Sequence, residues 1–285
     1  MTSPICREAP NIEAKSINAL LLAAGYGSRL KPYTNEWPKC LMPVHGSPLL
    51  EYWLQSIKEL GANKVLVNIH YLATTVEAFL KRPTFSSWVD FVYEPELMGT
   101  AGTILTNYSY LANSTLLLVH ADNYCQCDFS AFLRYHQAER PKDCLITMMT
   151  FDTPTPSTCG IVEVDSLGVV TAFHEKVPNP PGNRANGAVY LLEPLVLEWI
   201  REHPEAQDFS TQVLPRFLGR IATWHNDQVH IDIGTIESLR EAQNSQFLNL
   251  SKGGATEVDD WKKEFASHPI HQQLNSPFYT IINGQ

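Results

Sequence analysis

Two hydrophobic patterns alternate between residues 17 and 122, and this alternation limits the chain to few folds. Continuous apolar runs, typical of buried strands, are separated by segments whose apolar residues recur at helical spacing. The runs predict strands over residues 17–25, 64–71, 89–94 and 114–122, and the helical segments cover 48–60, 74–82 and 99–111. Strands that return through helices form a parallel sheet covered on both faces. Ligands bind such sheets at the carboxyl ends of the strands, which predicts one rim formed by Gly25–Arg29, Glu94–Thr103 and Asp122.

The second half of the chain has predicted strands connected by shorter turns. These strands cover residues 143–151, 160–165, 168–176 and 186–192, and a helix follows over 193–203. Leu167-Gly168, directly after Asp165-Ser166, predicts a hairpin turn. Beyond residue 243 the apolar pattern weakens. We therefore divide the chain into a polar lead-in (1–16), one α/β domain (17–243) and a C-terminal extension of unassigned role (244–285).

Composition narrows the class of function. The 285 residues are 44% hydrophobic, enough for a sizeable core, and carry a formal net charge of -9. An acidic balance disfavours binding to nucleic acid or to anionic membranes, although a few cations can still serve one small anionic substrate. No run is long enough to span a bilayer, the N-terminus lacks the apolar core of a secretory signal, and six scattered cysteines predict reduced thiols. We expect a soluble cytoplasmic protein and leave a homo-oligomer open.

The loop after the first predicted strand carries the clearest chemical signal. It contains Gly25, Gly27 and Arg29, and Lys39 follows in a Pro-Lys pair. Glycines let backbone N–H groups approach phosphate oxygens, Arg29 can bind a phosphate through two parallel hydrogen bonds, and Lys39 adds a compact second cation. A dinucleotide fingerprint would need a third glycine where Leu30 stands, and the loop lacks the Gly-Lys-Ser/Thr run of a P-loop.

The full stretch from Leu22 to Val44 closely resembles the opening signature of the sugar-nucleotide-forming nucleotidyltransferases, also called nucleoside-diphosphate-sugar pyrophosphorylases. That signature runs L-A-(A/G)-G-x-G-T-R-L-x-P-x-T, then P-K-x-L-x-P-V. The chain departs from it at Ser28, where threonine is usual, and Ala24 stands where members carry alanine or glycine. The resemblance covers about residues 17–243. It implies a Rossmann-like α/β fold with a mixed, mostly parallel sheet and helices on both faces.

The resemblance also implies which residues bind the nucleotide and a metal ion. A second segment, Glu94 to Thr103, starts a glycine-rich helix whose N–H groups and positive dipole end suit a phosphate. The implied nucleotide-binding residues are Leu22, Ala23, Ala24, Gly25, Gly27, Ser28, Arg29, Glu94, Gly99, Thr100 and Ala101. Asp122 and Asp232 are the implied ligands of Mg²⁺, a cation that prefers oxygen donors. Family members usually have glycine before the first aspartate, where this chain has Ala121.

The sugar-phosphate residues implied by the resemblance lie in the second half of the chain. They are Gly160, Glu175, Lys176 and Asn186, with a weaker match around Asp208. Lysine suits a phosphate as a point charge, and a carboxylate suits sugar hydroxyls as an acceptor with two oxygens. The residues expected to carry catalysis are Arg29, Lys39, Asp122, Lys176 and Asp232.

The activity implied is Mg²⁺-dependent transfer of a nucleotidyl group from a nucleoside triphosphate to a sugar 1-phosphate. The short, single-domain length and the segment from Glu94 to Gly102 look most like guanylyltransferases acting on mannose- or heptose-type phosphates. Three alternatives stay open: a uridylyl- or thymidylyltransferase, a cytidylyltransferase that forms a CDP-alcohol, and an inactive regulatory protein that binds a sugar nucleotide. Retention of all the charged residues expected to carry catalysis disfavours an inactive regulatory protein.

Overall fold

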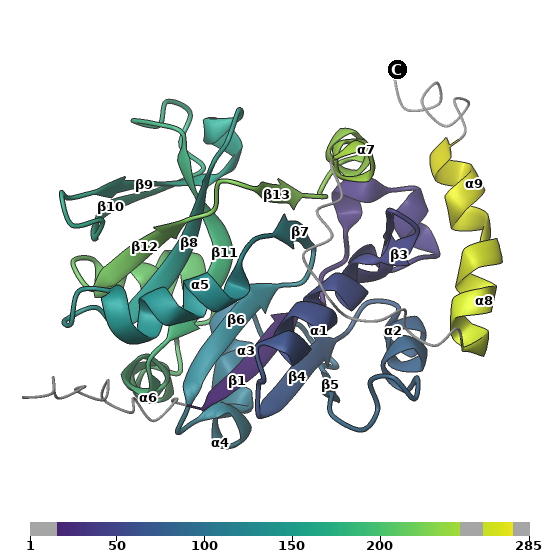
Figure 1. The fold of residues 1–285 in the computed structure, drawn as a ribbon, viewed down its shortest axis with the longest axis horizontal. Helices are drawn as coiled ribbons and strands as arrows, with labels where there is room; N and C mark the ends of the chain where they lie inside the picture. Colours follow the sequence, from purple (N-terminus) through teal and green to yellow (C-terminus); the bar gives the residue numbers. More distant parts are fainter. Residues whose placement is uncertain (1–15, 246–258, 276–285) are drawn as a thin grey trace, which may run out of the picture.

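The computed structural model describes residues 16–245 and 259–275. Within them, a nine-stranded sheet has the order β10-β9-β11-β6-β1-β4-β5, and β8 and β12 continue it from β11 (Figure 1). One group of parallel strands consists of β1 (Ile17–Leu22), β4 (Lys64–Ile69), β5 (Asp90–Tyr93) and β6 (Thr115–His120), and β12 also pairs in parallel with β8. The remaining strands are β8 (Ile146–Asp152), β9 (Gly160–Val164), β10 (Val170–Glu175), β11 (Arg184–Leu192) and β12 (Ile221–His225). The predicted mostly parallel α/β sheet is confirmed.

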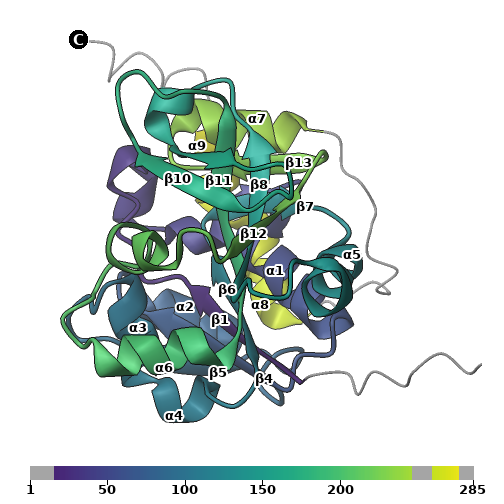
Figure 2. The ribbon, with the colours of Figure 1, turned by 90° about the vertical axis from the view of Figure 1, so that its left-hand side faces the viewer.

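The strands have apolar side chains on both faces, as buried parallel strands do. Ala19 and Leu21 pack into one core, whereas Leu20 packs into the other. The first core lies under α1 (Leu49–Glu59), α2 (Ala73–Leu80), α5 (Phe129–Arg134) and α7 (Ile236–Asn244), together with α8 (Asp260–Ser267) and α9 (Pro269–Asn275). The second lies under α3 (Thr100–Thr106), α4 (Tyr108–Leu111) and α6 (Pro194–Glu202). Figure 2 shows these three helices on one side of the sheet and α1, α5 and α8 on the other.

The structure departs from the predicted elements in two places that have a clear physical cause. The strand predicted to reach residue 25 ends at Leu22, because the Ala23 N–H donates to the side chain of Asn68 (2.8 Å) instead of to a strand. The helix predicted over 99–111 is divided at Asn107, whose side-chain amide donates to the Thr103 carbonyl and competes with the helical pattern. Helix α1 ends as expected, with Gly61 in the left-handed conformation that glycine favours.

A short antiparallel ribbon connects the two halves of the chain at the rim. Strand β7 (Asn123–Gln126) pairs with β13 (Val229–Asp232), and Asn123 lies opposite Asp232. A second short ribbon pairs β2 (Pro43–Val44) with β3 (Ser47–Pro48). Because Asn123 directly follows Asp122, the pairing of β7 with β13 places Asp232 near Asp122 at the end of β6.

Two observations bear on the expectations from composition. In the residues that the structure describes, no helix has the length and apolar character needed to cross a membrane. The five cysteines of that part, namely Cys40, Cys125, Cys127, Cys144 and Cys159, are free thiols. The predicted boundaries at residues 16 and 243 stay predictions, and residues 1–15 lie outside the described ranges.

Candidate active site

The loop after β1 has a backbone conformation that requires glycine at one position. Gly27 has a φ of +61°, and its carbonyl accepts hydrogen bonds from the Leu30 N–H (2.9 Å) and the Thr34 hydroxyl (2.8 Å). A Cβ at residue 27 would lie 2.9 Å from the Thr34 methyl carbon and 3.1 Å from the Lys39 Cβ. The predicted phosphate loop is therefore folded back against the segment that carries Lys39.

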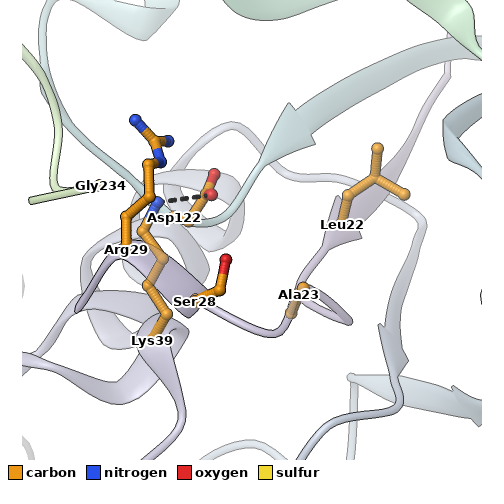
Figure 3. Close-up of a pocket in the computed structure, with 9 residues that line it drawn as sticks. Leu22, Ala23, Ser28, Arg29, Lys39, Asp122 and Gly234 are labelled. Carbon is orange, nitrogen blue, oxygen red and sulfur yellow. Dashed lines mark hydrogen bonds and ion pairs between the residues drawn. The ribbon is translucent and has the colours of Figure 1, made fainter. Parts of the chain in front are cut away.

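Four charged side chains converge where this loop meets the end of β6 and the β7–β13 ribbon. The Lys39 ammonium donates to Asp122 Oδ2 (2.8 Å) and to Asp232 Oδ1 (2.9 Å), and Lys39 is only 6% exposed. Arg29 Nη2 lies 3.2 Å from Asp232 Oδ2. Figure 3 shows Lys39 bonded to Asp122, with Arg29 beside them. We call Arg29, Lys39, Asp122 and Asp232 the charge cluster. The expectation that residues so far apart in sequence meet in one place is confirmed.

Electrostatics keep the centre of this cluster charged. Burial lowers the pKa of Lys39, but attraction and hydrogen bonds from Asp122 and Asp232 outweigh it and raise the pKa above the ordinary 10.5. Burial raises the pKa of Asp122, but the nearby Lys39 outweighs it, and the pKa lies below the ordinary 3.8. Burial also lowers the pKa of His120, so this neighbouring imidazole is neutral at pH 7. Lys39 and Asp122 thus form a preformed pair of opposite charges.

The cluster also contains the donor type that a divalent cation needs. One ammonium bridges the two carboxylates, so both aspartates face the same point. Both donors are carboxylate oxygens, the ligand type that Mg²⁺ prefers. Among the described residues no group of three or more His, Cys, Asp or Glu side chains suits a metal. A cation at Asp122 and Asp232 would therefore complete its coordination with phosphate oxygens and water.

Two cavities meet at the charge cluster. The first, which we call the loop cavity, is lined by Leu22, Ala23, Gly25, Gly27, Ser28, Arg29, Lys39, Asp122 and Gly234. Figure 3 shows this cavity from β1 to the cluster. The second, the strand cavity, is lined by Arg29, His120, Asp122, Asn123, Phe151, Thr158, Cys159, Gly160, Glu175, Lys176, Asn186, Ala188, Ser210, His230 and Asp232. Arg29 and Asp122 line both, so a molecule in each cavity would contact the same two charged groups.

The structure gathers all four predicted sugar-phosphate residues in the strand cavity. Lys176 is 66% exposed at its side chain, and its ammonium lies 3.4 Å from Glu175 Oε1. A Cβ at Gly160 would lie 2.6 Å from Glu175 Oε2, so glycine is needed for Glu175 to take its place. The Asn186 amide donates to the Tyr190 hydroxyl (2.6 Å) and accepts from the Ala188 N–H (3.0 Å), which fixes its orientation at the cavity wall.

The segment from Glu94 to Ala101 lines neither cavity, unlike most of the other predicted nucleotide-binding residues. Glu94 is buried, and its carboxylate accepts hydrogen bonds from Asn68, from the Thr103 hydroxyl (2.6 Å) and from the Met98 N–H. The Ala101 and Gly102 N–H groups donate to the Gln207 carbonyl (2.8 and 3.3 Å). The expectation of free amides at this helix start is therefore wrong for these two. Neither cavity lining, within the described chain, includes Ala24, Glu94, Gly99, Thr100 or Ala101.

Sequence reasoning missed a residue that organises the rim. Asn68, on β4, accepts from the Ala23 N–H through its oxygen and donates to Glu94 through its nitrogen (3.1 Å). It thereby connects the end of β1 to the segment after β5. A lone amide within the apolar run of residues 64–69 was the available signal, since a buried polar side chain needs partners.

Comparison with known proteins places these features in a family context. A family model described as nucleotidyl transferase matches residues 18–247. The chain is 28% identical over 205 residues to the mannose-1-phosphate guanylyltransferase of Mycobacterium tuberculosis, covering 71% of this chain and 55% of that protein. It is 25% identical over 245 residues to the UTP–glucose-1-phosphate uridylyltransferase of Synechocystis, covering 79% and 62%. The chain thus spans little more than half the length of these curated relatives.

A solved structure supports the same fold. The structure of HddC from Yersinia pseudotuberculosis, complexed with GMP-PN, aligns with a TM-score of 0.66 at 24% sequence identity. The alignment covers 79% of this chain and 97% of that one. The family model ends at residue 247 and therefore does not extend over the whole C-terminal extension.

Proposed function

This chain belongs to the nucleotidyl transferase family, and we propose that it transfers a nucleotidyl group from a nucleoside triphosphate to a sugar 1-phosphate. The observation that carries this proposal is the meeting of two cavities at Arg29 and Asp122. Each substrate brings a phosphate group, and the reaction requires these two groups to touch. A site in which both cavities share a cation and a carboxylate suits that requirement.

In the proposed reaction, an oxygen of the sugar phosphate attacks the α-phosphorus of the triphosphate and forms a new P–O bond. The bond between the α-phosphorus and the oxygen that bridges it to the β-phosphorus breaks, and pyrophosphate leaves with that electron pair. No protein nucleophile is needed. The chain's own contribution is positioning and stabilisation of charge in a preformed polar site.

The cations divide this work according to their positions. Arg29, at the junction of the cavities, would stabilise the leaving pyrophosphate, and the buried Lys39 would act on the α-phosphate. Lys176, at the strand cavity, would hold the sugar phosphate. Asp122 and Asp232 would hold Mg²⁺, whose charge offsets that of the phosphate oxygens. Glu175 and Asn186 would bind sugar hydroxyls, and Gly25, Gly27 and Ser28 would approach the triphosphate.

For the nucleotide and sugar we propose GTP and a mannose- or heptose-type 1-phosphate. The likeness to a mannose-1-phosphate guanylyltransferase supports this choice. The relative named as a uridylyltransferase keeps UTP as the alternative. The strand cavity disfavours an alcohol phosphate, because Glu175 and Asn186 both line it and offer acceptors for hydroxyl groups.

A grid of nucleoside triphosphates against sugar 1-phosphates, with Mg²⁺ and read by pyrophosphate release, tests the proposal. We expect release to require both substrates and to be fastest with GTP. A Lys39→Met protein serves as the inactive control. If no pair releases pyrophosphate while a sugar nucleotide still binds, the chain is a binding protein and the proposed activity is wrong. Release with phosphocholine and CTP alone would favour a CDP-alcohol product.

A further inference from the structure

Helices α8 and α9 belong to the extension whose role the sequence left unassigned, and they lie against the segment that carries Lys39. Trp37 stands two positions before Lys39 and is buried. Its ring stacks on Phe265 of α8 (centroids 5.7 Å apart, planes 25° apart) and lies 4.2 Å from the ring of His268. Figure 1 shows α8 and α9 at the edge of the molecule beside α2. A ring contact of 5.0 Å between Phe79 of α2 and Trp261 of α8 agrees with that view.

The other end of Trp37 is fixed to the turn that contains Lys39. The indole N–H donates to the Leu41 carbonyl (2.8 Å). The turn from Lys39 to Leu41 is closed by backbone bonds from Leu41 to Pro38 (3.0 Å) and from Met42 to Lys39 (3.1 Å). Trp37 therefore contacts both α8 and the turn that contains Lys39.

Helix α8 is anchored by buried charges rather than by apolar contact alone. Arg82, which is 3% exposed, donates to Asp259 Oδ2 (2.6 Å) and to Glu51 Oε2 (3.1 Å). Lys262 of α8 donates to Glu51 Oε1 (3.1 Å). Asp259 also caps α8, since its Oδ1 accepts from the Lys262 N–H. Breaking such a buried pair leaves an uncompensated charge, which disfavours release of the helix from this position.

We propose that α8 is a positioning element of the active site, and that Phe265 and Trp37 are the residues through which it places Lys39. The proposal rests on the proposed function, in which Lys39 acts on the α-phosphate. A lysine has a long and flexible side chain, so the placement of its backbone decides where the ammonium can reach. A misplacement of about 1 Å at a reacting group can cost on the order of a hundredfold in rate.

The first experiment compares Phe265→Ala with Phe265→Leu and with Trp88→Ala in the full-length chain. Phe265→Ala removes the ring that stacks on Trp37, and Phe265→Leu keeps most of its apolar volume. Trp88 is an aromatic control, because its ring contacts Phe85 and Lys58 and its N–H donates to Thr84. The readouts are hydrogen exchange of the amides from 37 to 44, and kcat and KM for pyrophosphate release.

We expect Phe265→Ala to speed exchange in that segment and to lower kcat about tenfold, while KM for either substrate changes less than twofold. Phe265→Leu should restore most of both values, and Trp88→Ala should change neither. Unchanged exchange, or faster exchange with unchanged kcat, would overturn the positioning role. If the wild-type chain releases no pyrophosphate from any pair, the proposed function fails, and the exchange measurement alone then decides whether α8 orders the segment.

A second pair of variants tests the anchor without touching the aromatic contact. Asp259→Ala removes both the cap of α8 and the ion pair with Arg82, whereas Asp128→Ala removes only the cap of α5. We expect the first, and not the second, to speed exchange from 37 to 44 and to lower kcat several-fold. Equal effects of the two cap variants would show a general loss of stability and would contradict the proposal.

Discussion

The two lysines assigned to phosphate groups lie in opposite environments. Lys39 is buried, bonds to two carboxylates at 2.8 and 2.9 Å, and lies in a turn to which the Trp37 indole N–H donates a hydrogen bond. Lys176 is mostly exposed, its ammonium lies 3.4 Å from Glu175 Oε1, and it has a φ of +49° at the end of β10. The difference indicates that the chain itself organises the side of the site proposed for the triphosphate. On the side proposed for the sugar phosphate, we expect the ligand to supply the partner of the cation.

The largest expected effect comes from removing the metal, and it tests whether the charge cluster is ordered by the chain alone. We expect chelation by EDTA to abolish pyrophosphate release and added Mg²⁺ to restore it, a loss of at least about 10³-fold. Because the Lys39 ammonium already bonds to both aspartates and Arg29 contacts Asp232, the melting temperature should change little on chelation. Full turnover without metal would remove the assigned role of the two aspartates.

Replacing Lys39 by methionine, a residue of similar length, should lower kcat about 10³-fold, since a preorganised charge is lost from a buried site. The same variant leaves Asp122 and Asp232 facing each other without their shared cation. Circular dichroism and a thermal melt establish that the protein is folded. A folded Lys39→Met protein with wild-type turnover would show that the buried lysine serves only the structure, and the comparison between the two lysines would then lose its catalytic meaning.

Local patterns predicted the parallel half of the fold well, because each of its strands is a continuous apolar run and α1 has a clear stop at Gly61. They could not derive the partner of β13. Strand β7 is four residues, Asn123–Gln126, with no alternation of apolar and polar positions, so its pairing depends on contacts distant in sequence. The family resemblance, rather than any local pattern, predicted that Asp232 and Asp122 lie together.

Contacts between residues distant in sequence also explain why two other features could not be predicted. The amides at the start of α3 were expected to be free, but the Gln207 carbonyl, from a distant loop, takes two of them. The polar composition after residue 252 gave no sign of a docked helix. The position of α8 depends on ion pairs with Arg82 and Glu51. These two charged residues lie in segments whose pattern predicts ordinary helices.

Arg29 lines both cavities, so its replacement tests how far the environments of Lys39 and Lys176 differ. Its guanidinium is largely exposed and contacts Asp232 at 3.2 Å. An exposed ion pair contributes only about 0–1 kcal/mol to stability, so Arg29→Ala should melt close to wild type. Turnover should fall about 10²-fold, a typical loss for a donor that stabilises charge in the transition state. Unchanged activity in the folded variant would refute the role proposed for Arg29.

The smallest expected effect is at Lys176, and it separates binding from catalysis. Because this ammonium is exposed and loosely held, its removal should act on substrate binding more than on turnover. We expect Lys176→Ala to raise KM for the sugar 1-phosphate about tenfold, the equivalent of about 1.4 kcal/mol, with kcat reduced less. Lys176→Arg should recover part of the loss, since it restores the charge but not the compact ammonium. A fall in kcat as large as that of Lys39→Met, with unchanged KM, would show that Lys176 is as preorganised as Lys39 once substrate is bound.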